Sequence, residues 1–136
     1  GTYSNNKIIP SPIRLSAQCT RVAVADGHMA CISIKMKEKV ASKDILEAWQ
    51  TFKGLKLPSA PKFPVHYLEG KKHPQPKLHR HLEGGMAVSV GRLRECPLYD
   101  WKFVALSHNT IRGAAGCAIL NAELLVDSGL IHPLEA

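Results

Sequence analysis

No uninterrupted apolar run in this chain of 136 residues approaches the roughly 18–20 residues of a membrane-spanning helix, so the sequence predicts no such helix. Aromatic residues are few, at 6%, but hydrophobic residues reach 45% and charged residues 21%, the ordinary balance of a soluble globular domain. This length allows one domain. No signal-peptide pattern opens the chain, and its first residue is Gly1 rather than Met, so we expect a processed or engineered fragment.

The four cysteines are widely spread, and no CxxC pair occurs. Zinc sites and disulfide frameworks need closer or more numerous cysteines, so reduced thiols in a cytoplasmic protein fit best. His79 and His81 could chelate a metal weakly, but no acidic or thiolate partner stands at matching spacing. We therefore expect no physiological metal.

Acidic residues are also in the minority. The chain has 18 Lys and Arg against 11 Asp and Glu, a net charge of +7. Such a charge raises the alternative of a basic nucleic-acid-binding module. The basic residues are scattered along the whole chain, however, and no RNP, KH or helix-turn-helix motif occurs, so we expect neither a nucleic-acid nor a membrane partner.

The first part of the chain predicts strands. Residues 1–16 carry two prolines and little periodicity, and we expect an irregular lead-in with one short strand near 13–15. Residues 17–25 are rich in β-branched and small side chains and predict a strand. Residues 28–37 alternate apolar and polar side chains, which is typical of a half-buried strand. The intervening Asp26-Gly27 is a strong reversal signal.

A helix should follow. Ser42 is the expected N-cap, with Asp44 in the first turn, and the helix should end before Gly54. Its apolar stripe consists of Ile45, Leu46, Trp49 and Phe52.

The second half predicts strands at 63–68, 86–95 and 98–107, with a polar loop at 69–85, and then a helix over 113–128 with Gly129 at C′. One face of the last strand carries Tyr99, Trp101 and Phe103. This order predicts an α+β fold in which a mixed, largely antiparallel sheet has its helices on one face.

Several blocks of residues also resemble a known family. They are CTRVAVADGH, LPSAPKFP, PQPKL, GGMAVSVGRLRE and FVALSHNTIRGAAG, in this order. The chain is similar over residues 17–128 to aspartate-semialdehyde dehydrogenases of the fungal and archaeal branch. The resemblance implies a sheet like the C-terminal domain of glyceraldehyde-3-phosphate dehydrogenase. Residues 1–110 would belong to the catalytic and dimerisation domain, and 111–136 would be a C-terminal helix and tail that packs on an NADP-binding domain.

The family reaction, in the biosynthesis of lysine, methionine, threonine and isoleucine, is the NADPH-dependent reductive dephosphorylation of L-aspartyl-4-phosphate to L-aspartate 4-semialdehyde. It runs through a thioester on a cysteine. The resemblance assigns substrate carboxylate binding to Arg21, acid–base chemistry to His28, and nicotinamide contact to Asn109 with Gly113 beside it. It also implies a homodimer or higher homo-oligomer.

Two family motifs do not occur in this sequence: the dinucleotide fingerprint GxGxxG of a Rossmann domain, and the Asn-Cys step of the nucleophile turn. We therefore expect the chain alone to be inactive and not to bind NADP.

The residues alone leave other interpretations open. Arg21 could be a salt-bridged strand residue, His28 an ordinary histidine at a turn, and residues 113–116 a close-packed helix start. A tight turn at 26–27 would also place Arg21 about 13 Å from His28, so we expect no tight hairpin there. Cys19, inside the predicted strand, should be an inert, partly buried thiol.

Overall fold

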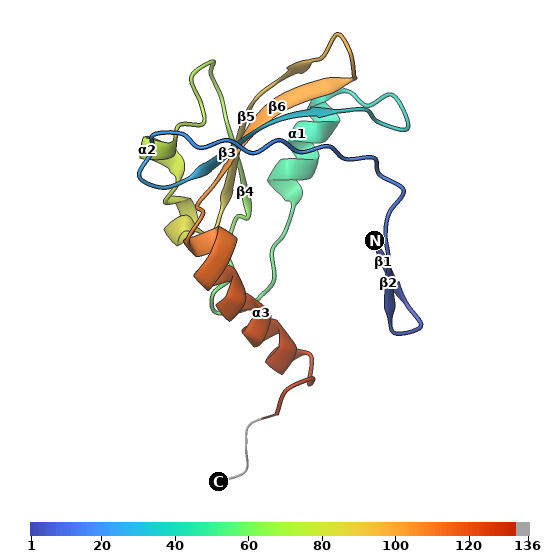
Figure 1. The fold of residues 1–136 in the computed structure, drawn as a ribbon, viewed down its shortest axis with the longest axis vertical. Coiled ribbons are helices and arrows are strands. Elements are labelled where there is room, and N and C mark those ends of the chain that lie inside the picture. Colours follow the sequence, from blue (N-terminus) through green and yellow to red (C-terminus); the bar gives the residue numbers. More distant parts are fainter. Residues whose placement is uncertain (133–136) are drawn as a thin grey trace.

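A four-stranded sheet forms the body of the chain, whose residues 1–132 are described by a computed structural model (Figure 1). The strand order is β3 (His28–Ile34), β6 (Trp101–Ser107), β5 (Val88–Glu95) and β4 (Val65–Leu68). β6 runs antiparallel to both of its neighbours, whereas β4 runs parallel to β5. This arrangement confirms the predicted α+β fold with a mixed, largely antiparallel sheet.

The expected irregular lead-in instead contains a hairpin of β1 (Thr2–Ser4) and β2 (Lys7–Ile9), and no strand forms at 13–15. Asn5 and Asn6 make its turn at φ 50° and 58°, a conformation that asparagine tolerates better than most residues. The prediction for residues 1–16 was therefore wrong, because the turn chemistry of the Asn-Asn step was overlooked.

Residues 17–25 do not form the predicted strand, and their side chains are exposed. β3 pairs with β6 on one side, and within residues 1–132 no strand pairs with its outer edge, so the β-branched composition of residues 17–25 did not suffice to add them to the sheet. No hairpin forms at 26–27, as expected. The chain enters β3 through Gly27 at φ +113°, a backbone conformation that favours glycine.

Helix α1 (Ser42–Thr51) covers one face of the sheet. Its N-cap is Ala41 rather than the expected Ser42, and the carboxylate of Asp44 accepts the Ala41 N–H at 3.3 Å. Trp49 packs between Tyr67 and Phe103, with ring centroids 6.0 Å and 5.0 Å away.

The predicted aromatic face of β6 is therefore covered only in part. The indole nitrogen of Trp101 donates to the Val40 carbonyl at 3.0 Å, which adds a second attachment to the α1 side of the sheet. Tyr99 lies before the start of β6 and remains 51% exposed.

The opposite face is covered near one end by the segment that joins β4 to β5. The segment was expected to be a loop, but it contains the short helix α2 (Pro76–His79) and the 3₁₀ turn η1 (Leu82–Gly85). Beneath it lies the centre of the core, where Leu106 and Ser89 are each 1% exposed.

The C-terminal helix follows a π-helical turn, η2 (Ile111–Ala115), and runs as α3 (Gly116–Asp127) away from the end of the sheet (Figure 1). This confirms the helix predicted over 113–128, and Gly129 ends it at φ +68° as expected of a C′ residue. The predicted tail continues into residues 133–136, which lie outside the described residues.

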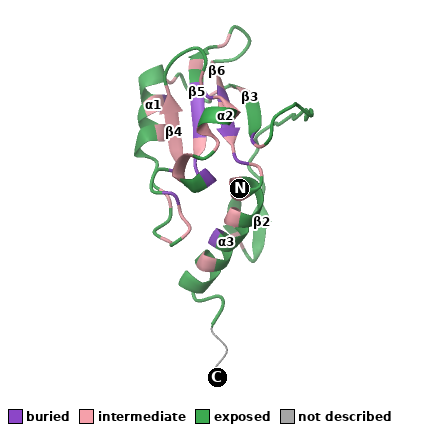
Figure 2. Ribbon diagram, turned by 90° about the vertical axis from the view of Figure 1, so that its left-hand side faces the viewer, coloured by how far each residue is buried: buried purple, intermediate pink, exposed green. Residues whose placement is uncertain are grey.

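Most of α3 is exposed although it is rich in apolar residues (Figure 2). Leu120 is its buried residue, whereas Ile119 and Val126 are 55% and 52% exposed. The carboxylate of Glu123 accepts both the backbone N–H and the hydroxyl of Ser59, at 2.9 Å and 2.7 Å, and so ties the helix to the loop before β4. Within residues 1–132, no helix is both long and apolar enough to cross a membrane.

Candidate active site

The end of the sheet where β3 begins and β6 ends brings two predicted site segments together. His28 is the first residue of β3 and pairs with Ser107, the last residue of β6. Just outside this pair, the Gly27 N–H donates to the side-chain oxygen of Asn109 at 2.9 Å, across 82 residues of sequence. The predicted acid–base segment and the predicted cofactor segment therefore touch.

His28 is exposed at this end of an edge strand. The register pairs it with Ser107, which in turn pairs with Val88 on the other side of β6, so these three side chains share the α1 face of the sheet. An exposed imidazole on a fixed strand can exchange protons with a bound ligand without unfolding of the site.

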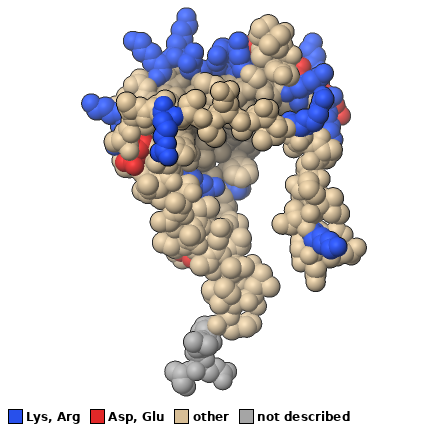
Figure 3. All heavy atoms as spheres, in the orientation of Figure 1, with Lys and Arg blue, Asp and Glu red and all other residues tan. Residues whose placement is uncertain are grey.

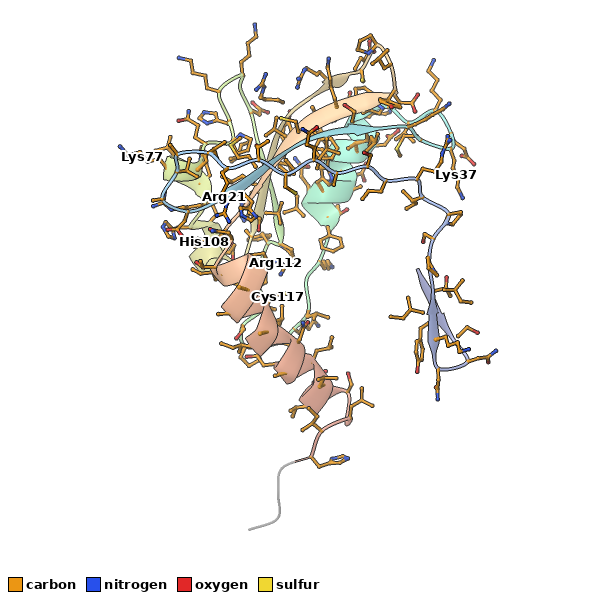
Figure 4. All side chains as sticks on the ribbon, in the orientation of Figure 1. Arg21, Lys37, Lys77, His108, Arg112 and Cys117 are labelled. Atoms are coloured by element: carbon orange, nitrogen blue, oxygen red, sulfur yellow. The ribbon has the colours of Figure 1, made fainter. Side chains whose placement is uncertain are left out.

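Arg21 lies in the irregular segment before β3, and its side chain is exposed. Within residues 1–132 it makes no salt bridge, so the alternative of a salt-bridged strand residue is not supported. In Figure 4, Arg21 lies with His108 and Arg112 toward the end of the sheet where α3 begins, whereas Lys37 lies at the other side of the molecule.

Gly113 lies in the π-helical turn, where its N–H donates to the His108 carbonyl at 2.9 Å. This N–H is therefore already used, so a ligand could approach Gly113 at its Cα. The glycine itself is exposed, which leaves that approach open.

The structure also shows a residue that the sequence reasoning missed. His108 is 3% exposed, at the junction between β6 and η2. Its Nδ1 lies 3.3 Å from the backbone nitrogens of both Thr110 and Ile111. The signal in the sequence was the polar step His-Asn-Thr immediately before a helix, in the place where a capping side chain is usual.

Comparison with known proteins identifies the family. The model of the semialdehyde dehydrogenase dimerisation domain matches residues 2–112, which include Arg21, His28 and Asn109. The chain belongs to the semialdehyde dehydrogenase family.

Aspartate-semialdehyde dehydrogenases are among the relatives that match over most of the chain. The Saccharomyces cerevisiae enzyme is 48% identical over 131 residues, which cover 91% of this chain and 36% of that protein. The enzyme of Methanothermobacter thermautotrophicus is 41% identical, with 92% of this chain and 38% of that protein covered. The chain thus spans about a third of the length of the curated relatives it matches, and the predicted resemblance is confirmed.

Solved structures agree with this assignment. The crystal structure of aspartate-semialdehyde dehydrogenase with NADP from Candida albicans superposes with a TM-score of 0.69 at 42% identity, and covers 78% of this chain and 31% of that one. Aspartate-semialdehyde dehydrogenase II from Vibrio cholerae, at 20% identity and a TM-score of 0.58, shares the fold.

The four cysteines of this family member are free thiols in the structure. Cys19 is exposed and outside any strand, so its expected partial burial in a strand was wrong. Cys96 lies at the opposite end of the sheet from His28, in the turn after β5. The backbone N–H of Leu98 lowers the pKa of the Cys96 thiol, with smaller contributions in the same direction from Tyr99, Ser33 and Lys102.

Basic side chains gather over the upper part of the molecule in the view of Figure 3, and α3 carries few charges. They come from several elements rather than from one helix or strand. Across residues 1–132, no group of three or more His, Cys, Asp or Glu residues could hold a metal ion. His79 instead hydrogen-bonds the backbone of Gln75 through its Nδ1, at 2.9 Å from the nitrogen.

Proposed function

We propose that this chain supplies the catalytic and dimerisation part of an aspartate-semialdehyde dehydrogenase, which reduces L-aspartyl-4-phosphate with NADPH to L-aspartate 4-semialdehyde and phosphate in amino-acid biosynthesis. The family assignment supports this proposal. The single structural observation that carries it is the hydrogen bond from Gly27 to Asn109, which joins a segment suited to proton transfer to one suited to cofactor contact.

The chemistry of the exposed groups suits the proposed substrate. The guanidinium of Arg21 offers a planar pair of donors that fits the α-carboxylate of an aspartyl group. His28 would exchange the proton that moves during the reaction, because imidazole changes its charge closest to neutral pH. Residues 1–110 would form this catalytic part.

The fit to NADP rests on Asn109. Its side-chain oxygen is occupied by the Gly27 N–H, while within residues 1–132 its amide nitrogen donates no hydrogen bond. That nitrogen is therefore available to a carbonyl such as that of the nicotinamide carboxamide, and the small Gly113 leaves room nearby. NADPH would supply the hydride.

The dinucleotide fingerprint and the Asn-Cys step do not occur in this sequence, so a polypeptide segment outside these 136 residues must supply both to the active enzyme. The exposed apolar residues of α3 support packing of residues 111–136 on a nucleotide-binding domain. We expect the polypeptide of 136 residues alone to give no NADPH oxidation with aspartyl phosphate above a protein-free blank.

A chimera tests the proposed activity. Residues 2–112 of this chain replace the matching segment of the Saccharomyces cerevisiae relative, and NADP reduction is measured with L-aspartate 4-semialdehyde and phosphate. We expect turnover, and a loss of roughly tenfold or more in kcat/KM for Arg21→Lys, because lysine keeps the charge but loses the paired donors. His28→Gln should lose most of kcat.

The control is Lys37→Ala, at the other side of the molecule, which should leave both constants unchanged. A chimera that folds as judged by circular dichroism but stays inactive would contradict the proposed function. Unchanged kcat/KM in Arg21→Lys would show that Arg21 is structural.

The same proposal includes a homodimer and a cytoplasmic location with free thiols. The α1 side of the sheet is already covered in part, so the surface available for pairing includes the other face of β3, where Met29 is 48% exposed. Sedimentation equilibrium from micromolar to hundreds of micromolar should give twice the chain mass of 14.9 kDa. A mass near 14.9 kDa throughout would contradict the dimer.

A further inference from the structure

The buried imidazole of His108 has no part in the roles assigned above. It is 3% exposed, although histidine is usually more accessible. The ring of His81 packs against it, with the two ring centroids 5.0 Å apart and the ring planes tilted by 55°. Gly85 also approaches so closely that a Cβ there would lie 3.3 Å from Cδ2 of the His108 ring. The ring is therefore held in place by packing.

The contacts of this ring define which nitrogen carries the proton. The backbone N–H groups of Thr110 and Ile111 each lie 3.3 Å from Nδ1 of His108. The Thr110 hydroxyl lies 3.2 Å from the same atom. Because a backbone N–H can only donate, Nδ1 must accept, and the ring proton belongs on Nε2. The imidazole thus takes the place of the side-chain oxygen that usually caps a helix start.

The backbone of His108 holds the next turn as well, since its carbonyl accepts the Gly113 N–H at 2.9 Å. Asn109 therefore lies between anchored neighbours, and its own side-chain oxygen reaches the Gly27 N–H. Loss of the hydrogen bonds at Nδ1 of His108 would free the turn that carries Asn109. The hydrogen bond between Asn109 and the Gly27 N–H, at the entry to β3, would then weaken.

We propose that His108 is a positioning residue: its unprotonated Nδ1 fixes the turn after β6, which places the Asn109 amide against Gly27 and next to His28. The value of this placement for catalysis rests on the function proposed above. The placement itself is a property of the chain and is measured without NADP or substrate.

The test uses nitrogen-15 NMR on the full chain at neutral pH. Imidazole spectra report which ring nitrogen of His108 carries the proton, and amide exchange of Gly27 reports its bond to Asn109. We expect the proton on Nε2. His108→Ala should speed Gly27 exchange by about fivefold or more, the effect of losing one ordinary capping acceptor.

Two further variants separate positioning from bulk packing. His108→Asn supplies an acceptor oxygen close to the place of Nδ1 and should keep Gly27 exchange within about twofold of the original chain. His81→Ala removes the ring contact but leaves Nδ1 bonded, and should also stay within about twofold.

A proton on Nδ1, or Gly27 exchange that does not change in His108→Ala, would overturn the proposal. If His108→Ala does not fold, the proposal is still tested by the ring-proton measurement and by His108→Asn. Fast Gly27 exchange in His108→Asn would overturn the proposal as well. An inactive chimera, by contrast, would refute the proposed function, but it would not change the NMR result for His108 and Gly27.

Discussion

Replacing Gly27 by alanine should damage the junction on which the candidate site depends. Gly27 has φ +113°, where a residue with a side chain is strained by about 1–2 kcal/mol. The added Cβ would also lie 3.1 Å from the Cδ1 of Leu106, which is 1% exposed and has little room to move. Such overpacking adds roughly 1–2 kcal/mol. We expect a total loss of about 2–4 kcal/mol in the free energy of unfolding.

The matched control is Gly70→Ala. Gly70 has a similar φ of +98°, but a Cβ there would make only an ordinary contact, at 3.4 Å from the Cδ2 of His73. Gly70→Ala should therefore lower the free energy of unfolding by the backbone strain alone, about 1–2 kcal/mol. The difference between the two variants isolates the contact with the core.

Urea denaturation followed by tryptophan fluorescence measures both variants. With a slope near 2 kcal/mol per molar urea, Gly27→Ala should lower the midpoint by about 1–2 M and Gly70→Ala by about half as much. Equal midpoints for the two variants would refute the packing argument, and an unchanged midpoint for Gly27→Ala would refute the backbone argument too.

Three other perturbations test separate parts of the molecule. Trp49→Ala removes the ring that packs on Tyr67 and Phe103 and should cost about 2–4 kcal/mol of unfolding free energy, against less than about 0.5 for its exposed neighbour in Gln50→Ala. Glu123→Ala breaks both hydrogen bonds to Ser59 and should lower the free energy of unfolding, measured with urea, by about 2 kcal/mol. The control is Glu47→Ala at an exposed position of α1, and an equally small loss in both variants would show that the attachment to Ser59 is weak. Because the pKa of Cys96 is lowered, its thiolate forms at lower pH, and its alkylation by iodoacetamide should rise at lower pH than that of free cysteine. Ser33→Ala should shift the alkylation of Cys96 to higher pH, because Ser33 helps to lower this pKa. If Cys96 in the original chain were alkylated at the same pH as free cysteine, the lowered pKa would be contradicted.

The sequence predicted those elements that have two different faces. Alternation at β3, and Ile45, Leu46 and Trp49 of the predicted stripe of α1, follow directly from burial of one side against the sheet. The fourth predicted stripe residue, Phe52, is the C-cap of α1 and is 57% exposed, so its place in the stripe was wrong. The prediction of a strand at residues 17–25 was wrong because β-branched composition reports only a local preference. The outer edge of β3 could have paired with this segment, but within residues 1–132 no strand pairs there.

The candidate site was harder to predict. The roles of Arg21 and His28 came from resemblance, because nothing in their spacing distinguishes them from ordinary surface residues. The contact between Gly27 and Asn109 joins positions 82 residues apart, which no local pattern reports. His108 was missed because its capping role depends on burial, and burial of a single polar residue is decided by tertiary packing.

The pairing of β3 with β6 also affects how the protein is made. β3 is translated long before its partner, and Asn109 follows Gly27 by 82 residues. At about 5–20 residues per second on the ribosome, the nascent strand waits roughly 4–16 s before the segment that completes its end is synthesised. Throughout that interval its apolar side chains have no sheet to pack into, so the nascent strand is exposed to chaperones and to aggregation until β6 is made.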